Sequence, residues 1–526
     1  MERRKYRGTF VRTCFSVLTV IAFTWIFIFI HVNQKDLKED EGKFMPTWKT
    51  RDLRASIRDQ HMEFIPENTL DVRKDYYDEL SKDDVLEVIG DKVRMNMLAE
   101  DARDAILKEM LHDGPRDSLA YIKLKDSLTD RKKHEPEHNL TFWTLNLDPV
   151  EVFEIKHLLQ KFGVRIIERN FSPLCSKMNT CASSLFPGLQ ASSLLENSHR
   201  NVVNLLMRHN YTWLPEINNA DAILCLSPGS TCQLFFQQGK PLIVLPTHRY
   251  EVGRSARWMT WNLNLKQINY QETNTLAVRD EYDKQYMNHF LGITPTLIGR
   301  HCGYVDLTYT PEFPHIFLYP GAPENFLSMF KKDLFSTLEK EKENILVKVG
   351  NTNHIKDPTR LKEYKAIIYI PTRVSSIKFT ELYRMNIPLY IPSYKLLALW
   401  ESEYRLILDR VFPNSTRKFD TGVSLISGRS SAFTDPNSYS VESLTRWLQY
   451  LEYYNMPGVQ YFASVRDLAD KLRAASTQSL KAYSSRMKAY NAVNMRYIES
   501  KWKEVIRRVR KNKQEHVAKL YQRKMR

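Results

Sequence analysis

The chain has 526 residues, a net charge of +16 and six cysteines. So few cysteines exclude a disulfide-held scaffold, and stability must come from an ordinary hydrophobic core. Residues 481–526 hold fifteen Lys and Arg against three Glu, a net charge of +12, so the rest of the chain is nearly balanced. We expect a basic helical tail there, either solvated or in contact with acidic glycans or lipid headgroups, and not a nucleic-acid-binding domain.

The N-terminal region predicts a membrane anchor. Residues 13–30 read TCFSVLTVIAFTWIFIFI without a charge, which is long enough to span most of a hydrocarbon core about 30 Å thick. The twelve preceding residues carry five Lys and Arg against one Glu, which predicts a cytoplasmic tail (1–12) and a type II signal anchor (13–32). A cleaved signal peptide is disfavoured, because its apolar run is usually shorter and ends at small residues. The short span favours the Golgi membrane over the plasma membrane, with the ER as an alternative.

The translocated part contains four N-x-[ST] sequons, which fit a secretory lumen and predict glycosylation at Asn139, Asn170, Asn210 and Asn414. Among its cysteines, Cys175 and Cys181 are close enough to close a local loop. Cys225, Cys232 and Cys302 could be buried thiols as readily as disulfide partners.

Charged residues dominate residues 33–138, and helical fragments occur without any sustained β-branched run, which predicts a partly helical stem. Stem helices often pair, so a homodimer through this segment is possible. The segment RKKHEPEHN (131–139) marks its end, and the composition then changes abruptly.

From residue 140 onward, short apolar runs alternate with helical runs, which predicts α/β folding with parallel sheets. We expect a first Rossmann-like domain over 139–300 and a second over 301–480. The first has predicted strands at 140–147, 164–170, 220–227 and 241–247, with helices at 148–163, 199–210 and 230–240. The second has predicted strands at 315–321, 344–351, 365–372 and 387–393, with helices at 324–342, 379–386 and 395–412.

The two predicted domains share a weak internal similarity. Residues 222–251 and 366–395 both run strand, polar loop, helix, Pro, strand, and aligning Pro241 with Pro388 brings Ile223 onto Ile370. Duplication and shared fold geometry explain this equally well.

Open α/β sheets bind ligands beyond the carboxyl ends of their strands, so a cleft between the two domains is the expected site. Gly321 follows the first strand of the second domain and precedes a helix, where backbone amides could approach a diphosphate or simply form a turn. Arg373, Ser375 and Ser376 follow another strand and could cradle a phosphate. Helix capping explains the serines equally well, but leaves Arg373 unexplained.

The helix that begins there, in FTELYRMNIPLYIPS, resembles the nucleotide-sugar domain of glycosyltransferases with two facing Rossmann-like domains, the GT-B fold. Glu381 and Pro388 stand at the seven-residue offset of that family's Glu-Ala-Met-like helix and Gly-x-Pro strand. The resemblance implies that Glu381 accepts hydrogen bonds from the ribose of the donor. Asn386 replaces the usual glycine, and Arg373 stands where many retaining members have a second glutamate.

Two further loops carry candidate residues. The loop PTHRYEVGR places His248, Arg249, Glu251 and Arg254 after a strand of the first domain, where His or Glu could act as general base and the arginines could offset leaving-group charge. A salt-bridged loop is the alternative. In the second domain Lys348, Asn351 and His354 could contact the donor.

These features predict a glycosyltransferase that moves a sugar from a nucleotide sugar to a glycan or glycoprotein in the secretory lumen. The α/β region lacks an Asp-x-Asp metal triad, so we expect no metal cofactor. It also lacks a G-x-S-x-G elbow and a P-loop, which disfavours a serine hydrolase and a P-loop sulfotransferase or kinase. The alternatives are a non-catalytic lumenal or cell-surface glycan-binding protein with a vestigial cleft, and another transferase such as one that uses activated sulfate.

Overall fold

The computed structural model describes residues 118–127, 139–184, 215–250, 258–340, 345–350, 358–411 and 435–525. All of them belong to one compact unit, Glu79–Arg526. The predicted cytoplasmic tail, signal anchor and most of the predicted stem lie outside the described residues. Within the described ranges, no helix is both long enough and apolar enough to cross a membrane.

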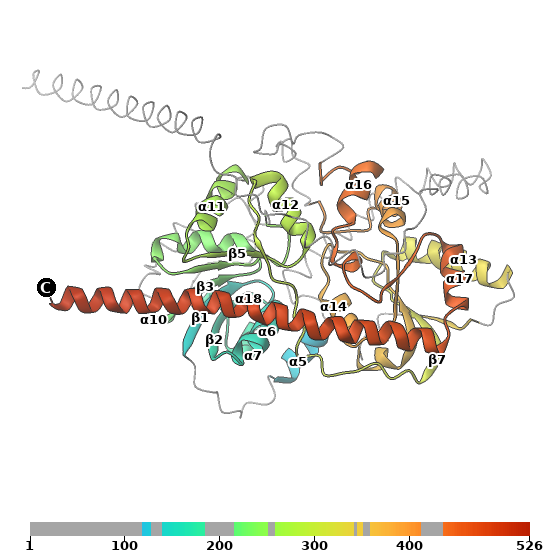
Figure 1. The fold of residues 1–526 in the computed structure, drawn as a ribbon, viewed down its shortest axis with the longest axis horizontal. Coiled ribbons are helices and arrows are strands. Elements are labelled where there is room, and N and C mark those ends of the chain that lie inside the picture. The colour runs from blue at the N-terminus through green and yellow to red at the C-terminus, as the bar shows by residue number, and fades with distance from the viewer. Residues whose placement is uncertain are drawn as a thin grey trace, which may run out of the picture. The chain divides into compact units, whose positions relative to one another are not determined.

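The first α/β lobe contains a six-stranded sheet in the order β2-β1-β3-β4-β5-β6, in which every pair is parallel (Figure 1). Its central strands are apolar and buried, as expected for a parallel sheet covered on both faces. Its strands are β1 (Leu140–Asn146), β2 (Val164–Asn170), β3 (Ala222–Cys225), β4 (Leu242–Val244), β5 (Thr275–Val278) and β6 (Thr296–Leu297).

The second lobe contains a five-stranded parallel sheet in the order β11-β10-β9-β7-β8. Its strands are β7 (Phe313–Leu318), β8 (Val347–Val349), β9 (Tyr364–Ile368), β10 (Leu389–Pro392) and β11 (Gln460–Phe462). The structure thus confirms the prediction of mixed α/β folding with parallel sheets.

The strand order is the same in both lobes. Numbered from its own first strand, each sheet runs 2-1-3-4-5, the order of flavodoxin-like folds, and the first sheet adds a sixth strand. The two similar stretches of sequence, 222–251 and 366–395, both begin in the third strand of their lobe and pass through the fourth. They therefore occupy equivalent places in the two sheets.

The helices have their own local signals. Asp148 caps α6 by accepting a hydrogen bond from the Val150 amide at 2.9 Å, and Pro149 occupies the first helical position. The predicted helix at 230–240 is instead a 3-10 helix, Gly229–Gln238, tied by the Cys225–Cys232 disulfide to the end of β3. The remaining helices are α7 (Cys175–Met178), α10 (Pro215–Asn219), α11 (Trp258–Tyr270), α12 (Glu281–Leu291), α13 (Glu324–Lys340), α14 (Ile377–Arg384), α15 (Tyr394–Tyr404), α16 (Val441–Leu448) and α17 (Val465–Arg473), besides α6 (Pro149–Gln160), α5 and α18.

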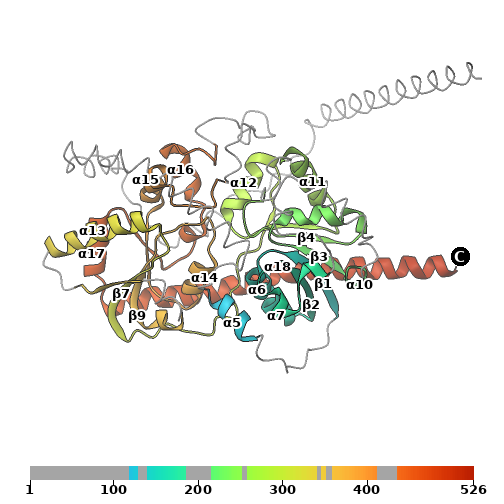
Figure 2. The ribbon, with the colours of Figure 1, turned by 180° about the vertical axis from the view of Figure 1, so that it is seen from behind.

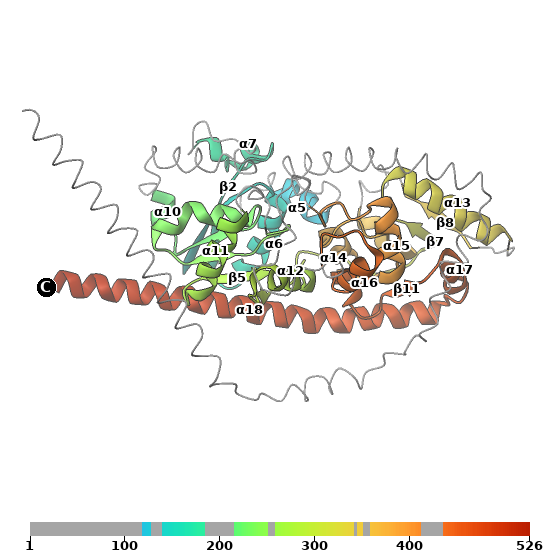
Figure 3. The same cartoon turned by 90° about the horizontal axis from the view of Figure 1, so that it is seen from above.

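The C-terminal helix α18 (Thr477–Met525) packs on both lobes (Figures 1 and 3). Its first part joins the core of the second lobe through Leu480 and Met487. Its middle part packs on the first sheet and α6 through Ile498, Trp502, Val505, Ile506 and Val509. The first part of the predicted basic tail is therefore packed against the two lobes.

Helix α5 (Leu119–Ser127) lies inside the range assigned by sequence to the stem, yet it belongs to the folded unit (Figure 2). Leu119 and Ala120 are buried in the same core cluster as Trp143 and Phe317, so this end of the predicted stem packs against both lobes. The sequence does not predict this packing, because the partner lies far along the chain. The first amides of α5 donate to the carboxylate of Glu381 on α14.

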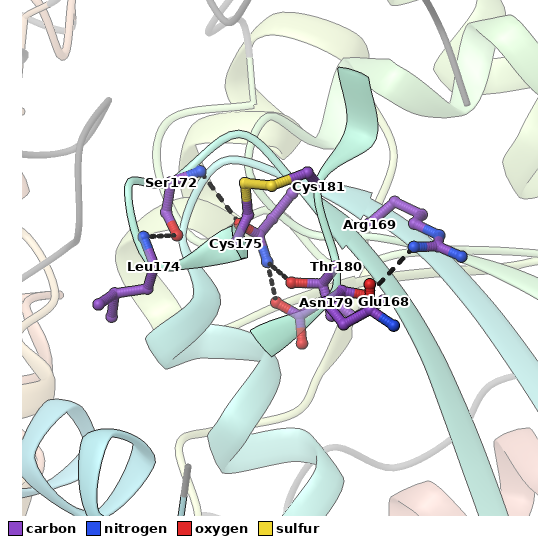
Figure 4. Close-up of a disulfide and its surroundings, with 9 residues drawn as sticks. Glu168, Arg169, Ser172, Leu174, Cys175, Asn179, Thr180 and Cys181 are labelled. Carbon is purple, nitrogen blue, oxygen red and sulfur yellow. Dashed lines mark hydrogen bonds between the residues drawn. A yellow bond between two sulfur atoms is a disulfide. The ribbon is translucent and has the colours of Figure 1, made fainter. Parts of the chain in front are cut away.

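The Cys175–Cys181 disulfide closes a short loop after β2 (Figure 4). Asn170, at the end of β2, is fully buried, and its amide nitrogen donates to Glu168 Oε1 at 2.8 Å and to Thr180 Oγ1, within the disulfide loop, at 2.9 Å. With both amide protons used inside the fold, Asn170 is not accessible for glycosylation in this structure. Asn139 is exposed, while Asn210 and Asn414 lie outside the described residues. Cys302 is a buried free thiol.

We predict that Trp502→Ala destabilises the full chain, because the removed indole is completely buried between α18 and the first sheet. The expected loss in the free energy of unfolding is about 3–5 kcal/mol, measured by denaturant titration. Tyr497→Ala, on the exposed side of the same helix at 43% exposure, is the matched control and should change stability far less. Equal losses in the two variants would contradict the inference that burial of Trp502 holds α18 on the first lobe.

Candidate functional site

Loops that follow the strands of both sheets meet in a cluster of mostly buried, charged and polar side chains, which we call the charged junction. Its first-lobe members come from the starts of α6 and α12 and from the segments after β4 and β6. Its second-lobe members come from the segments after β9, α15 and α16. They are Asp148, Glu151, His248, Arg249, Asp280, Arg300, Arg373, Ser375, Asp409 and Glu452.

Arg300 joins the two halves of the charged junction. Its Nη1 donates to Glu151 Oε1 at 2.6 Å, and its Nε donates to Ser375 Oγ at 3.2 Å. The Ser375 hydroxyl in turn donates to Glu452 Oε2 at 3.2 Å. A continuous chain of hydrogen bonds thus runs from α6 of the first lobe to the 3-10 helix Glu452–Tyr454 of the second.

Burial sets the protonation states of the carboxyl groups. It raises the pKa of Asp148 to about 7, assisted by the neighbouring Glu151. It raises the pKa of Glu452 to about 8 and also raises that of Asp280, with the charge of Arg300 opposing the shift in each case. The net charge of the junction therefore depends on pH in the neutral range, because removal from water disfavours the ionised carboxylates.

His248 lies four residues after β4 and is a neutral imidazole. Burial lowers its pKa well below the usual range, and the positive charges of Arg373, Arg300 and Arg249 lower it further. Its Nε2 atom is buried and has no hydrogen-bond partner among the described residues. A buried polar atom without a hydrogen bond lowers the stability of the fold. Nε2 of His248 is therefore suited to a hydrogen bond with a polar group of a ligand.

The two arginines predicted from sequence differ in their surroundings. Arg249 is 2% exposed, forms an ion pair with Asp283, and stacks on Tyr282 and Tyr286 with its guanidinium carbon 4.9 and 5.7 Å from the ring centroids. The charge of Arg249 is thus compensated within the first lobe. Arg373 is half-buried, and its guanidinium makes no hydrogen bond or ion pair to another described residue. Arg373 therefore keeps its donors available.

The start of α14, predicted as a phosphate cradle, is capped by the chain itself. Ser376 Oγ accepts from the Phe379 amide at 3.3 Å and from the Tyr369 hydroxyl at 3.0 Å. The Ser376 amide donates to Glu452 Oε1 at 2.5 Å. A carboxyl group thus occupies the place at this helix start where an anionic ligand would bind.

Glu381, which the family resemblance assigns to the donor ribose, is completely buried. Its Oε2 accepts from the Leu119 amide and its Oε1 from the Ala120 amide, both at 2.9 Å. The Tyr304 hydroxyl donates to Oε1 at 2.8 Å. A ribose would have to replace these donors, so in this structure Glu381 acts as the cap of α5.

Other predicted residues are not brought into the charged junction by any contact in the described ranges. Gly321 is exposed in the turn after β7, and Lys348 lies over the Tyr364 ring at 5.8 Å. Glu251, Arg254, Asn351 and His354 lie outside the described residues. Across the described ranges there is also no group of three His, Cys, Asp or Glu side chains able to hold a metal ion, and metal independence stays a prediction.

Sequence reasoning missed Arg300, Glu151 and Glu452. Arg300 follows a strand of only two residues, and Glu452 follows a helix, so neither has the periodic pattern that marks the end of a predicted strand. Glu151 looks like an ordinary acidic residue in the first turn of a helix.

We predict that Glu381→Ala lowers the free energy of unfolding by about 3 kcal/mol or more, because two buried amides and a tyrosine hydroxyl lose their acceptor together. Denaturant titration of the full chain measures this. Glu339→Ala, an exposed glutamate on α13, should stay within about 0.5 kcal/mol of the wild type. A Glu381→Ala protein as stable as the control would show that α5 is not held in this way.

We also predict a pH dependence of stability from Glu452. Its pKa in the folded chain, about 8, lies above the ordinary value of 4.5, so folding favours the protonated form. This stabilisation is fully present at acidic pH and is lost as the pH rises from 4.5 to about 8. Glu452→Gln should therefore flatten this part of the stability profile, whereas Glu442→Gln, on the exposed side of α16, should leave it unchanged. Identical profiles for the wild type and Glu452→Gln would refute the prediction.

The sequence matches no protein-family model and no curated protein. Among solved structures, the chain is similar to the glycosyltransferase SnogD from Streptomyces nogalater, at 11% sequence identity and a TM-score of 0.27. The similarity covers 65% of this chain and 100% of that one. Any function assigned to this chain must therefore rest on the strand order of its two sheets and on the side chains of the charged junction.

Proposed function

We propose that the chain is a glycosyltransferase that moves a sugar from a nucleotide sugar to a hydroxyl group of a glycan or glycoprotein. The observation that carries this proposal is His248: a neutral imidazole, with a buried Nε2 that lacks a partner among the described residues, held near three arginines. A base beside cationic groups is what a sugar transfer with an anionic leaving group needs.

In the proposed reaction His248 Nε2 removes the proton from the acceptor hydroxyl as that oxygen attacks the anomeric carbon of the donor. The bond between the anomeric carbon and the phosphate oxygen breaks, and the nucleoside diphosphate, or CMP in the case of a CMP sugar, leaves with the electron pair. The proton ends on the imidazole, and the configuration at the anomeric carbon inverts. The positive surroundings disfavour the imidazolium, but the negative charge that develops on the diphosphate offsets this cost.

Arg373 is the strongest candidate for binding the diphosphate, because its guanidinium has no partner among the described residues and its charge acts on His248. Arg300 contributes charge but is held by Glu151 and Ser375. Arg249 adds positive charge near His248, although it is paired with Asp283. With cationic groups in these places, we propose transfer without a metal ion.

The resemblance of the α14–β10 segment to donor domains of the GT-B fold favours a nucleotide site on the second lobe. Because Glu381 caps α5, a role for it in ribose binding requires α5 to move. Loss of nucleotide binding in a Glu381 variant would therefore not separate a binding defect from a folding defect, so Arg373 is the better residue to test. The proposed location, in the lumen of the Golgi on a type II anchor, rests on the sequence of residues 1–32.

We predict that the full chain binds and transfers from at least one member of a panel of UDP, GDP and CMP sugars, and that His248→Asn lowers kcat by roughly 10²- to 10⁴-fold. Nucleotide binding, measured as the rise in Tm, should persist in this variant because His248 acts on the acceptor. His516→Asn, an exposed histidine on α18, is the matched control and should behave as the wild type.

The possible outcomes separate the function from the mechanism. A chain that binds no nucleotide sugar would refute the glycosyltransferase proposal and favour a glycan-binding protein. Transfer with an unchanged kcat in His248→Asn would keep the function and remove His248 as the base. Activity that disappears with a chelator and returns with a divalent cation would refute metal independence.

A further inference from the structure

The last part of α18 extends beyond the core that holds the rest of the helix (Figures 1 and 3). Val505, Ile506 and Val509 are the last residues of the helix in the hydrophobic cluster. Between Lys511 and Gln522 every side chain with an assigned exposure is exposed, except the half-buried Asn512. Burial on the lobes therefore stabilises the helix up to residue 509 and no further.

This segment is strongly basic. Residues 507–526 contain nine Lys and Arg against one Glu, a net charge of +8. Lys513 forms an ion pair with Asp221 at 3.0 Å, and the sole glutamate, Glu515, lies 3.9 Å from Lys511. Arg507, Arg508 and Lys519 have no ion pair with another residue in the described part of the chain.

The helix dipole explains only a small part of this pattern. Cations are favoured near the C-terminal end, but the effect falls off within about one turn. Here the basic residues begin at Arg507, about five turns before the end of a helix with 3.6 residues per turn. Like charges three and four residues apart destabilise a helix, so the segment gains stability when a polyanion binds.

A membrane surface is a poor match for the segment. Helices that lie on membranes need one apolar face, whereas the row Lys513–Val517–Tyr521 mixes a lysine with two apolar side chains. Val517 and Tyr521 are 43% and 68% exposed. Between Arg507 and Lys519 the cationic positions are not confined to one face of the helix, which matches a flexible anionic chain better than a flat surface.

We propose that residues 507–525 of α18 form a docking surface for a polyanionic carbohydrate chain that carries sulfate or carboxylate groups. Nineteen helical residues extend over about 28 Å, so they can follow several sugar units. Lysine and arginine donors bind sulfate and carboxylate oxygens through charge-assisted hydrogen bonds. The proposal does not depend on glycosyl transfer, because the docking surface is separate from the charged junction.

The test compares two triple variants of the full chain in a neutral detergent. Arg507→Gln, Lys511→Gln and Lys519→Gln remove three charges from the docking surface. Lys481→Gln, Arg486→Gln and Lys488→Gln remove three exposed charges from the beginning of the same helix and form the matched control. A third variant, Arg507→Lys, Lys511→Arg and Lys519→Arg, keeps the charge. The probe is fluorescein-labelled heparin, followed by anisotropy over a range of salt concentrations.

We expect the first variant to bind heparin about tenfold more weakly or worse, with a shallower salt dependence, because fewer counterions are displaced. The control should stay within about twofold of the wild type, and the charge-conserving variant should bind normally. Equal weakening in the first two variants, or no weakening in the first, would overturn the proposal. Vesicles with phosphatidylglycerol that bind as tightly as heparin, with the same dependence on Arg507, Lys511 and Lys519, would overturn the choice of partner.

Discussion

The rest of the charged junction is built around the buried guanidinium of Arg300. It contacts Glu151 of the first lobe and Ser375 of the second, and it is 7% exposed. A buried charge is tolerated only when it is paired and hydrogen-bonded. The pairing requires that the segments after β6 and β9 stay together. Two other contacts join the lobes: the α5 amides donate to Glu381, and α18 packs on both cores.

Desolvation has opposite effects on the groups around this guanidinium. It raises the pKa values of Asp148, Asp280 and Glu452, and it lowers that of His248. Both effects come from the same cause, since burial disfavours whichever form is charged. The result at neutral pH is an uncharged imidazole beside permanently charged arginines, with part of the carboxylate charge removed by protonation. In the proposed reaction, the arginines would bind the anionic leaving group and the imidazole would accept the proton.

Much of the fold can be predicted from the sequence, and much of the site cannot. Apolar runs located β1 and β2 and most other strands, and the similarity of 222–251 to 366–395 reflects equivalent positions in two sheets of the same order. Polar residues directly after a buried strand are easy to recognise in a sequence, so the loop after β4 and its His248 can be predicted. Arg300 and Glu452 were missed because they follow a very short strand and a helix. The local sequence around Glu381 cannot show that a segment 261 residues earlier supplies hydrogen-bond donors to its carboxylate.

Two carboxyl groups of the chain occupy the places where sequence reasoning expected a nucleotide to be held. Glu381 accepts the α5 amides, and Glu452 accepts the Ser376 amide and the Ser375 hydroxyl. The two differ in how readily they can give way. Glu381 accepts hydrogen bonds from two α5 amides and the Tyr304 hydroxyl, so its release requires α5 to move. Burial raises the pKa of Glu452 to about 8, which favours its uncharged form at neutral pH. Under the proposed function, an anionic ligand would therefore reach Arg373, beside the start of α14, more readily than Glu381, whose hydrogen bonds would first have to break.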